Sequence, residues 1–163
     1  MLATIVIVLL VILDQLVKYL VKTNIPLGGS VPFLPGILGL THIHNTGAAF
    51  SMLSGARWFF VLLTVAFVIF GMWVLLTGRL RHPLGKWSWV LVLGGAIGNL
   101  IDRCVYGYVV DMFDLLLFDY PVFNLADCFV VVGVILGAVY YLWFYEKYDA
   151  RKKNDASDAD GDK

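Results

Sequence analysis

The residues of this chain best suited to chemistry are two aspartates, Asp111 and Asp127, which lie 16 positions apart. Asp111 follows the apolar pair Val109 and Val110, and Asp127 lies about one turn inside a long apolar stretch. If antiparallel helices bring the two side chains together, repulsion between the two negative charges raises the pKa of one carboxyl group, so the pair shares a proton. One aspartate could then act as a base toward water while the other acts as an acid. The pair therefore predicts hydrolysis of an amide by an activated water, without a covalent nucleophile.

Other hydrolytic chemistries have weaker support. Ser51 and Ser54 have histidines nearby but lie in no pattern such as G-x-S-x-G, so a serine mechanism is disfavoured. Asp114 and Asp119 are also acidic, but the run LLLFDYP predicts a surface loop, which makes these two residues secondary candidates.

A metal or cofactor site is not expected from the sequence. It holds two cysteines, Cys104 and Cys128, and the nearest nitrogen ligands are His42 and His44. No metal-type spacing such as C-x-x-C or H-E-x-x-H occurs. The cysteines are better interpreted as small buried hydrophobic residues than as a disulfide, and we expect neither a metal nor a cofactor.

The solvent of most of this chain must be lipid. Its 163 residues are 60% hydrophobic and 15% charged, and the mean hydropathy is +0.83, well outside the range of soluble globular proteins. Crossing about 30 Å of hydrocarbon takes roughly 20 apolar helical residues. We predict one integral membrane domain over residues 1–145, with helical spans at about 2–22, 58–77, 87–106 and 123–145.

The distribution of basic residues predicts the orientation of these spans. The connection after the second span holds Arg79, Arg81 and Lys86, whereas residues 23–56 contain no lysine or arginine. The positive-inside rule therefore places both termini and the second connection in the cytoplasm. Residues 146–163 are highly charged, lack apolar periodicity and are predicted to form a disordered cytoplasmic tail, whose basic start could also touch lipid headgroups.

The polar residues inside the spans gather in the outward halves of the helices. An ionisable side chain costs on the order of 3 kcal/mol at the bilayer centre, so such groups are expected to face one another in a polar pocket near the outer surface. Asp14 and Lys18 are spaced as a helical ion pair; they could be a charge-neutralising pair or part of the site, and a supporting role is favoured. The residues that meet at this level are Asp14, Lys18, Asn99, Asp102, Arg103, Asn124 and Asp127.

Three classes of function are candidates for a helical membrane bundle of this kind. A membrane transporter or proton relay would also use intramembrane Asp, Lys and Arg, but its path should continue into the cytoplasmic halves, which are apolar. A membrane assembly factor would explain Gly94, Gly95, Ala96 and Gly98 as a close-packing surface, but not the polar cluster. Paired carboxylates at an interface favour a hydrolase, and no basic, aromatic-interleaved surface suggests nucleic acid.

Five sequence blocks give a more specific identification. They are DQLVK (14–18), NTGAAFS (45–51), GGAIGNLIDR (94–103), VVD (109–111) and FNLADC (123–128). In this order and on four spans, they resemble the bacterial lipoprotein signal peptidases (signal peptidase II) over nearly the whole chain. The resemblance implies an all-α membrane protein with four transmembrane helices and a small extracytoplasmic β-containing cradle. Cys128 departs from the serine usually found at its position.

The resemblance also implies a function. Such enzymes are aspartyl endopeptidases that remove the signal peptides of diacylglyceryl-modified prolipoproteins by cleaving before the lipidated cysteine. This implies a monomer in the bacterial plasma membrane, in contact with membrane lipids, with its active site near the outer leaflet and with Asp111 and Asp127 as its catalytic pair. The residues that match other family positions and would shape or support the site are Asp14, Lys18, Asn45, Gly47, Asn99, Arg103, Asn124 and Ala126.

The long first connection, residues 23–56, mixes glycine, proline and short apolar runs. This pattern predicts small strands and a partly amphipathic segment on the outer leaflet, which the resemblance makes the cradle over the site. The run NTGAAF could alternatively be a tight turn that leads into the second span. Contact of Asn45 with the site is favoured.

Overall fold

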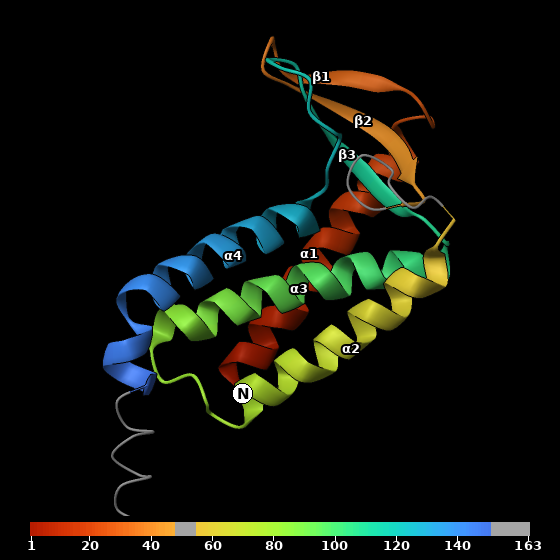
Figure 1. Ribbon diagram of the computed structural model, residues 1–163. Helices are drawn as coiled ribbons and strands as arrows, with labels where there is room; N and C mark the ends of the chain where they lie inside the picture. Colours follow the sequence, from red (N-terminus) through yellow and green to blue (C-terminus); the bar gives the residue numbers. More distant parts are fainter. Residues whose placement is uncertain (48–54, 151–163) are drawn as a thin grey trace, which may run out of the picture.

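Four long helices and a small sheet make up the computed structural model, which describes residues 1–47 and 55–150 (Figure 1). The helices are α1 (Leu2–Asn24), α2 (Arg57–Leu76), α3 (Pro83–Val105) and α4 (Leu125–Trp143). Each of them is long and apolar enough to cross a membrane, and each overlaps one of the predicted spans. Within the described part of the chain, the predicted architecture of four membrane helices is confirmed.

Local capping sets where the helices begin. α3 begins at Pro83 rather than at residue 87, because proline fits the first helical turn and the His82 ring accepts a hydrogen bond from the Leu84 amide. α4 begins at Leu125 because Asn124 is its N-cap. Capping therefore fixes the depth of the polar residues at the start of α4 more sharply than hydropathy does.

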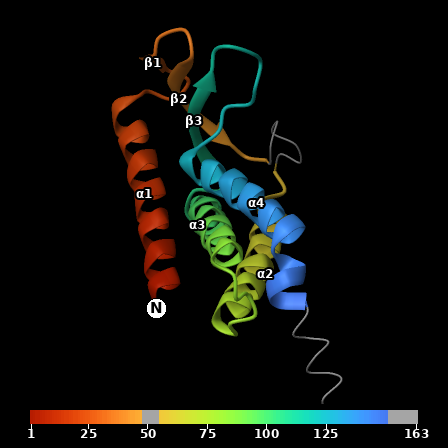
Figure 2. The same ribbon diagram turned by 90° about the vertical axis from the view of Figure 1, so that its left-hand side faces the viewer.

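α3 is the central helix of the bundle and contacts each of the other three. Figure 2 shows α1 on one side of α3 and α4 on the other. Glycines on α3 permit this close packing: a Cβ added at Gly95 would lie 2.3 Å from the Ala126 carbonyl oxygen of α4, and one added at Gly94 would lie 2.9 Å from the Leu10 side chain of α1. The small residues of the third span are a packing surface, as predicted.

A three-stranded antiparallel sheet lies at one end of the bundle, and it is the predicted β-containing cradle (Figure 1). Its strands, in sheet order, are β1 (Ser30–Leu34), β2 (Leu38–Asn45) and β3 (Val109–Leu115). One face of β3 packs on the end of α1 and on the C-cap residue that follows it, where Val21 and Ile25 form a buried cluster with Val110 and Met112. Because side chains alternate along a strand, Asp111 points to the opposite face.

Two predictions about single residues, one for Asp114 and one for Cys104, are corrected by the structure. Asp114, which directly precedes the run LLLFDYP and was grouped with this predicted surface loop, belongs to β3. It pairs with Gly39 of β2, and this non-local pairing has no local sequence signal. Asp119 lies in the exposed connection after β3. Cys104 is exposed rather than buried because it lies in the exposed last turn of α3, whereas Cys128 is half-buried, and both cysteines are free.

The C-terminal end is ordered further than predicted. Residues 146–150, assigned to a disordered tail, form a π-helical turn. Asp149 in this turn accepts hydrogen bonds from the Tyr140 hydroxyl of α4 and from the Arg81 amide of the connection between α2 and α3. These bonds attach the turn to the bundle. Residues 151–163 of the predicted tail lie outside the described residues.

We predict that Gly95→Ala destabilises the bundle. The new Cβ would lie 2.3 Å from a backbone carbonyl oxygen, so α3 and α4 must separate to accept it. Overpacking of this kind costs about 1–3 kcal/mol, and it opposes a helix-propensity gain of about 1 kcal/mol. Thermal unfolding in detergent should give a lower midpoint for Gly95→Ala, while Ala66→Leu on the exposed face of α2 should match the wild type. Equal midpoints for all three proteins would contradict the close packing.

Candidate active site

Asp111 and Asp127 line one cavity of about 350 Å³ at the sheet end of the bundle. Asp111 comes from β3 and Asp127 from the first turn of α4. The cavity has polar and apolar lining residues. The polar ones are Asn45, Asn99, Arg103, Asp111, Asn124 and Asp127, and the apolar side includes Pro121, Val122, Phe123, Val130 and Val131.

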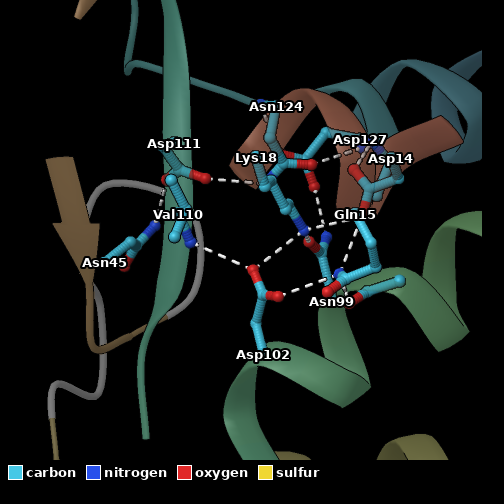
Figure 3. Close-up of polar contacts among 12 residues, drawn as sticks. Asp14, Gln15, Lys18, Asn45, Asn99, Asp102, Val110, Asp111, Asn124 and Asp127 are labelled. Carbon is cyan, nitrogen blue, oxygen red and sulfur yellow. Dashed lines mark hydrogen bonds and ion pairs between the residues drawn. The ribbon is translucent and has the colours of Figure 1, made fainter. Parts of the chain in front are cut away.

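Asn124 connects the two aspartates (Figure 3). Its side-chain Nδ2 donates to Asp111 Oδ1 at 2.6 Å, and its Oδ1 accepts from the Asp127 amide at 3.0 Å. Its backbone amide donates to Asp127 Oδ2 at 3.1 Å, which completes a capping box at the start of α4. The residue that begins the helix therefore also sets the position of one carboxylate relative to the other.

Asp127 occupies a position that favours negative charge. It is the third residue of α4, where the free amides and the dipole of the helix N-terminus attract anions. Besides the Asn124 amide, its carboxylate accepts a hydrogen bond from Asn99 Nδ2 of α3 at 2.8 Å. Both oxygens of Asp127 therefore have a donor from the protein, and the local surroundings suit a carboxylate that receives a proton during a reaction.

Asp111 has the same side chain as Asp127 but lies in different surroundings. It is only 3% exposed, and it accepts hydrogen bonds from Asn124 and, at 2.9 Å, from Asn45 Nδ2 of β2. Burial raises the pKa of Asp111 to about 6; the two asparagine hydrogen bonds act in the opposite direction, and the charge of Asp127 adds to the increase. Asp111 is thus able to carry a proton close to neutral pH.

Lys18 is a buried cation behind the aspartate pair, with 2% of its surface exposed. Its Nζ lies 2.9 Å from Asp14 Oδ2, 3.0 Å from Asp102 Oδ2 and 2.9 Å from Asn99 Oδ1. These contacts supply an acceptor for each of its three donor hydrogens. The Asn99 amide then continues the chain of contacts to Asp127, as the dashed lines in Figure 3 show.

The two carboxylates that hold Lys18 also hold the backbone near the catalytic candidates. Asp14 Oδ1 accepts from the Ala126 amide at 3.0 Å, one residue before Asp127. Asp102 Oδ2 accepts from the Val110 amide at 3.1 Å, one residue before Asp111. The cavity lining does not include Asp14, Lys18 or Asp102. Their contacts instead hold the backbone that carries Asp111 and Asp127, which is more than the role of a charge-neutralising pair.

Gln15 belongs to the same cluster and was not singled out by the sequence. Its Nε2 lies 2.9 Å from Asp102 Oδ1, 3.1 Å from the Gly98 carbonyl oxygen and 3.3 Å from Asp14 Oδ2. A search for charge passes over a neutral amide. The spacing of three residues to Lys18, which places both side chains on one face of α1, is the signal that could have found it.

The remaining predicted site residues are near the cavity as well. The Gly47 amide donates to Asn45 Oδ1 at 3.0 Å, and the Gly47 carbonyl accepts from the Arg103 guanidinium at 3.0 Å. Arg103 also lies over the Phe60 ring of α2, at 5.2 Å from its centroid. Ala126 is fully buried at the contact of α4 with α3. The rest of the NTGAAFS block, residues 48–51, lies outside the described residues.

The structure also bears on two alternatives to a peptidase site, a metal site and a polar path through the membrane. Over residues 1–47 and 55–150, no group of three or more His, Cys, Asp or Glu is arranged to hold a metal ion. Toward the other end of the bundle, a core cluster consists of apolar side chains around Ile7, Val90 and Leu93. This apolar packing gives no support to a polar path that continues through the membrane.

The chain is similar to signal peptidases in sequence and to bacterial membrane enzymes in structure. The sequence model of a family described as signal peptidase (SPase) II matches residues 6–144. Lipoprotein signal peptidases from Streptococcus pyogenes serotypes M2 and M5 are 45% identical over 145 residues, which cover 86% of this chain and 92% of each relative. Two solved structures described as bacterial membrane enzymes each have a TM-score of 0.80. The first is 32% identical, and the match covers 90% of this chain and 89% of that chain. The second is 33% identical, and the match covers 87% of this chain and 93% of that chain.

The Asn124 bridge predicts that Asn124→Ala destabilises the protein. Loss of an N-cap costs about 0.5–2 kcal/mol, and the buried Asp111 also loses its 2.6 Å donor. The thermal midpoint should fall measurably in detergent. Asn24→Ala is the matched control, because Asn24 is exposed at the end of α1 and its amide donates to Leu20 and Thr23 of that helix. Equal midpoints for the two variants would contradict the bridge.

The raised pKa of Asp111 predicts a pH-dependent stability. Its folded pKa of about 6 exceeds the ordinary value of 3.8, so its contribution is fully present below pH ~4 and is lost as the pH rises through about 6. At about 1.4 kcal/mol per pKa unit, the change amounts to ~3 kcal/mol. The midpoint of the wild type should therefore fall between pH 4.5 and 7.5 more steeply than that of Asp111→Asn.

Asp119→Asn removes an exposed aspartate near β3 and serves as the control for this pH series. It should keep the slope of the wild type. If the curves of wild type and Asp111→Asn run parallel, the buried carboxyl does not titrate as described.

Proposed function

This chain belongs to the signal peptidase II family, whose function is the removal of signal peptides from prolipoproteins, and we propose that it acts as an aspartic endopeptidase. The proposal rests on one observation: two carboxylates line one cavity and are joined through Asn124. In this proposal, Asp111 and Asp127 are the catalytic pair. The scissile bond is the amide before a diacylglyceryl-modified cysteine.

The unlike surroundings of the two aspartates suggest their roles. Asp127, with two donors at a helix N-terminus, is the ionised base. Asp111, whose pKa burial raises to about 6, is the protonated acid. Asn124 keeps both carboxyl groups at fixed positions and contributes a hydrogen bond to each of them.

The reaction then proceeds by attack of water. Asp127 takes a proton from a water molecule while the water oxygen forms a bond to the carbonyl carbon of the scissile amide. Asp111 donates a hydrogen bond to the carbonyl oxygen, and this bond strengthens as negative charge develops there. When the tetrahedral intermediate collapses, the C–N bond breaks, and the proton held by Asp127 passes to the leaving amine. Arg103 lines the same cavity and supplies positive charge near both aspartates.

The apolar residues that line the cavity support entry of the substrate from the lipid side. Val130 and Val131 of α4 belong to its apolar lining, and Val131 is 54% exposed on the helix surface that would face lipid. A substrate with a diacylglyceryl group could therefore keep its acyl chains in the bilayer while its peptide reaches the aspartates. In this proposal membrane lipids contact the enzyme and its substrate. The protein acts as a monomer, because one chain supplies both aspartates and the asparagine between them.

The proposed location is the bacterial plasma membrane, with the active site near its outer leaflet and both termini in the cytoplasm. The sheet and the cavity are at one end of the bundle, whereas Arg79, Arg81 and Lys86 lie in or beside the connection at the other (Figure 1). Basic residues favour the cytoplasmic side. A transporter or proton relay is not favoured, because the family is one of peptidases and the core around Leu93 is apolar.

We predict that Asp111→Asn and Asp127→Asn each abolish cleavage. The substrate is a purified diacylglyceryl-modified prolipoprotein, and the released signal peptide is measured by mass spectrometry with the enzyme in detergent or lipid nanodiscs. Loss of one member of an acid–base pair commonly lowers rates by about 10²–10⁴-fold for the proton transfer alone. Circular dichroism and thermal unfolding must show that both variants are folded.

Asp114→Asn and Asp119→Asn are matched controls, because they change aspartates close in sequence that do not line the cavity. Both should cleave at the wild-type rate. If Asp111→Asn or Asp127→Asn cleaves normally, the aspartic mechanism is wrong even though the family assignment stands. If the folded wild type does not cleave, the substrate proposal itself fails.

A further inference from the structure

Two histidines of β2 form a contact that the proposed peptidase mechanism does not use. His42 and His44 are separated by one residue, and their Nε2 atoms lie 3.1 Å apart. His44 pairs with Val110 of β3, while Ile43 pairs with Asp111. Because side chains alternate along β2, His44 lies on the face of the sheet opposite to the catalytic face. The pair is therefore separate from the active site, although Asn45 follows directly in the chain.

His42 is fixed at both its backbone and its ring. Its amide donates to the Gly29 carbonyl at 3.2 Å, and its carbonyl accepts from the Gly28 amide at 2.9 Å. Ring atom Nδ1 lies 2.8 Å from the Ile25 carbonyl oxygen. A carbonyl can only accept, so Nδ1 carries the hydrogen, and the Nε2 lone pair of the neutral ring points toward His44. A backbone carbonyl that orients the far nitrogen in this way is a common second partner of metal-binding histidines.

His44 is held in place by a different contact. Its ring stacks on the Tyr108 ring with a centroid distance of 3.6 Å and an interplanar angle of 16°. It is half-buried, so solvent and small ions can approach it, whereas His42 is 6% exposed. In the tautomer that carries its hydrogen on Nδ1, His44 directs a second Nε2 lone pair to the point between the rings.

The distance between these two nitrogens fits a shared metal ion. Imidazole nitrogens bind Zn²⁺ at about 2.0–2.1 Å, so two of them at a near-tetrahedral angle lie about 3.3 Å apart. The observed 3.1 Å is close to this separation and requires little movement of either ring. Imidazole ligands suit Zn²⁺, Cu²⁺ and Ni²⁺, whereas Mg²⁺ and Ca²⁺ prefer oxygen.

We propose that His42 and His44 form a two-nitrogen binding site for Zn²⁺ on the back of the extracytoplasmic sheet. Within the described residues, no third His, Cys, Asp or Glu completes the group, so water fills the other coordination positions and the ion exchanges freely. Lys22 of α1 is a positive charge that acts on His44, and its ammonium lies 3.5 Å from the centre of the Tyr106 ring. Its positive charge weakens the binding of a dication, which makes the affinity micromolar rather than tighter.

Binding at this position would affect the strand that supports the candidate active site. Between Leu40 and Ile43, the register of β2 against β3 shifts by one residue, so the segment that holds His42 is an irregular part of the strand. An ion bound to both histidines ties this segment to the position beside Asn45, which donates to Asp111. We therefore expect Zn²⁺ to raise the thermal stability of the folded protein.

Calorimetric titration with ZnCl₂ tests the site in full-length protein in detergent, from which any histidine tag has been removed. The wild type should bind one Zn²⁺ per chain with micromolar affinity, should unfold at a higher temperature with Zn²⁺, and should give no signal with MgCl₂. His44→Phe keeps an aromatic ring to stack on Tyr108 but removes the nitrogen ligand, so binding should be lost. His82→Gln removes a histidine that caps α3 at the other end of the bundle, and it should bind as the wild type does.

Each alternative outcome overturns the proposal. Binding of Zn²⁺ by His44→Phe with unchanged affinity would mean adventitious binding elsewhere on the protein. A wild type that binds no Zn²⁺ below ~1 mM would show that the two nitrogens share only a hydrogen bond. The thermal midpoint without metal shows whether His44→Phe is folded, and His42→Gln provides a second variant with the same expected loss.

Discussion

The need to neutralise one buried ammonium group organises the polar part of this protein. Lys18 has almost no exposed surface, and a buried charge that loses its partner costs about 3–5 kcal/mol. Asp14, Asp102 and Asn99 supply its acceptors. Each of these residues has a further contact, with the amide of Ala126, the amide of Val110 or the carboxylate of Asp127. Satisfying Lys18 therefore joins α1 and α3 to the start of α4 and to β3.

Close packing and polar contact depend on each other in this arrangement. A Cβ added at Gly98 would lie 2.6 Å from Asp14 Oδ2, so α1 can bring its carboxylate to the start of α4 only where α3 has no side chain. The same stretch of α3 supplies Asn99 and Asp102, one and four residues later. The block GGAIGNLIDR thus provides both the surface that lets the helices approach and the groups that join them after they have done so.

The membrane spans and the polar cluster could be predicted because hydropathy, charge and helical spacing are local properties of the sequence. The resemblance to a known family added the cradle and the roles of residues such as Asn45. The register of β2 on β3 cannot be predicted, because it depends on pairing between residues about 70 positions apart. For this reason the local sequence does not indicate that Asp114 belongs to a strand. Gln15 was missed because its contribution is a neutral hydrogen-bond donor with three acceptors from two helices. Capping by Asn124 has a local signature, but its bond to Asp111 requires the fold.

The two aspartates that line the cavity are identical side chains in unlike surroundings, and the difference arises from secondary structure. Asp127 lies in the first turn of a helix, where backbone amides have no partner within the helix and negative charge is stabilised. Asp111 lies on a buried part of β3 and accepts hydrogen bonds from two side-chain amides, those of Asn45 and Asn124. Burial outweighs these two bonds, so the pKa of Asp111 rises to about 6. Asn124 reaches both carboxyl groups because it is the last residue before the helix. The asymmetry therefore follows from placing one aspartate on each side of a strand-to-helix connection, and it requires no third ionisable group.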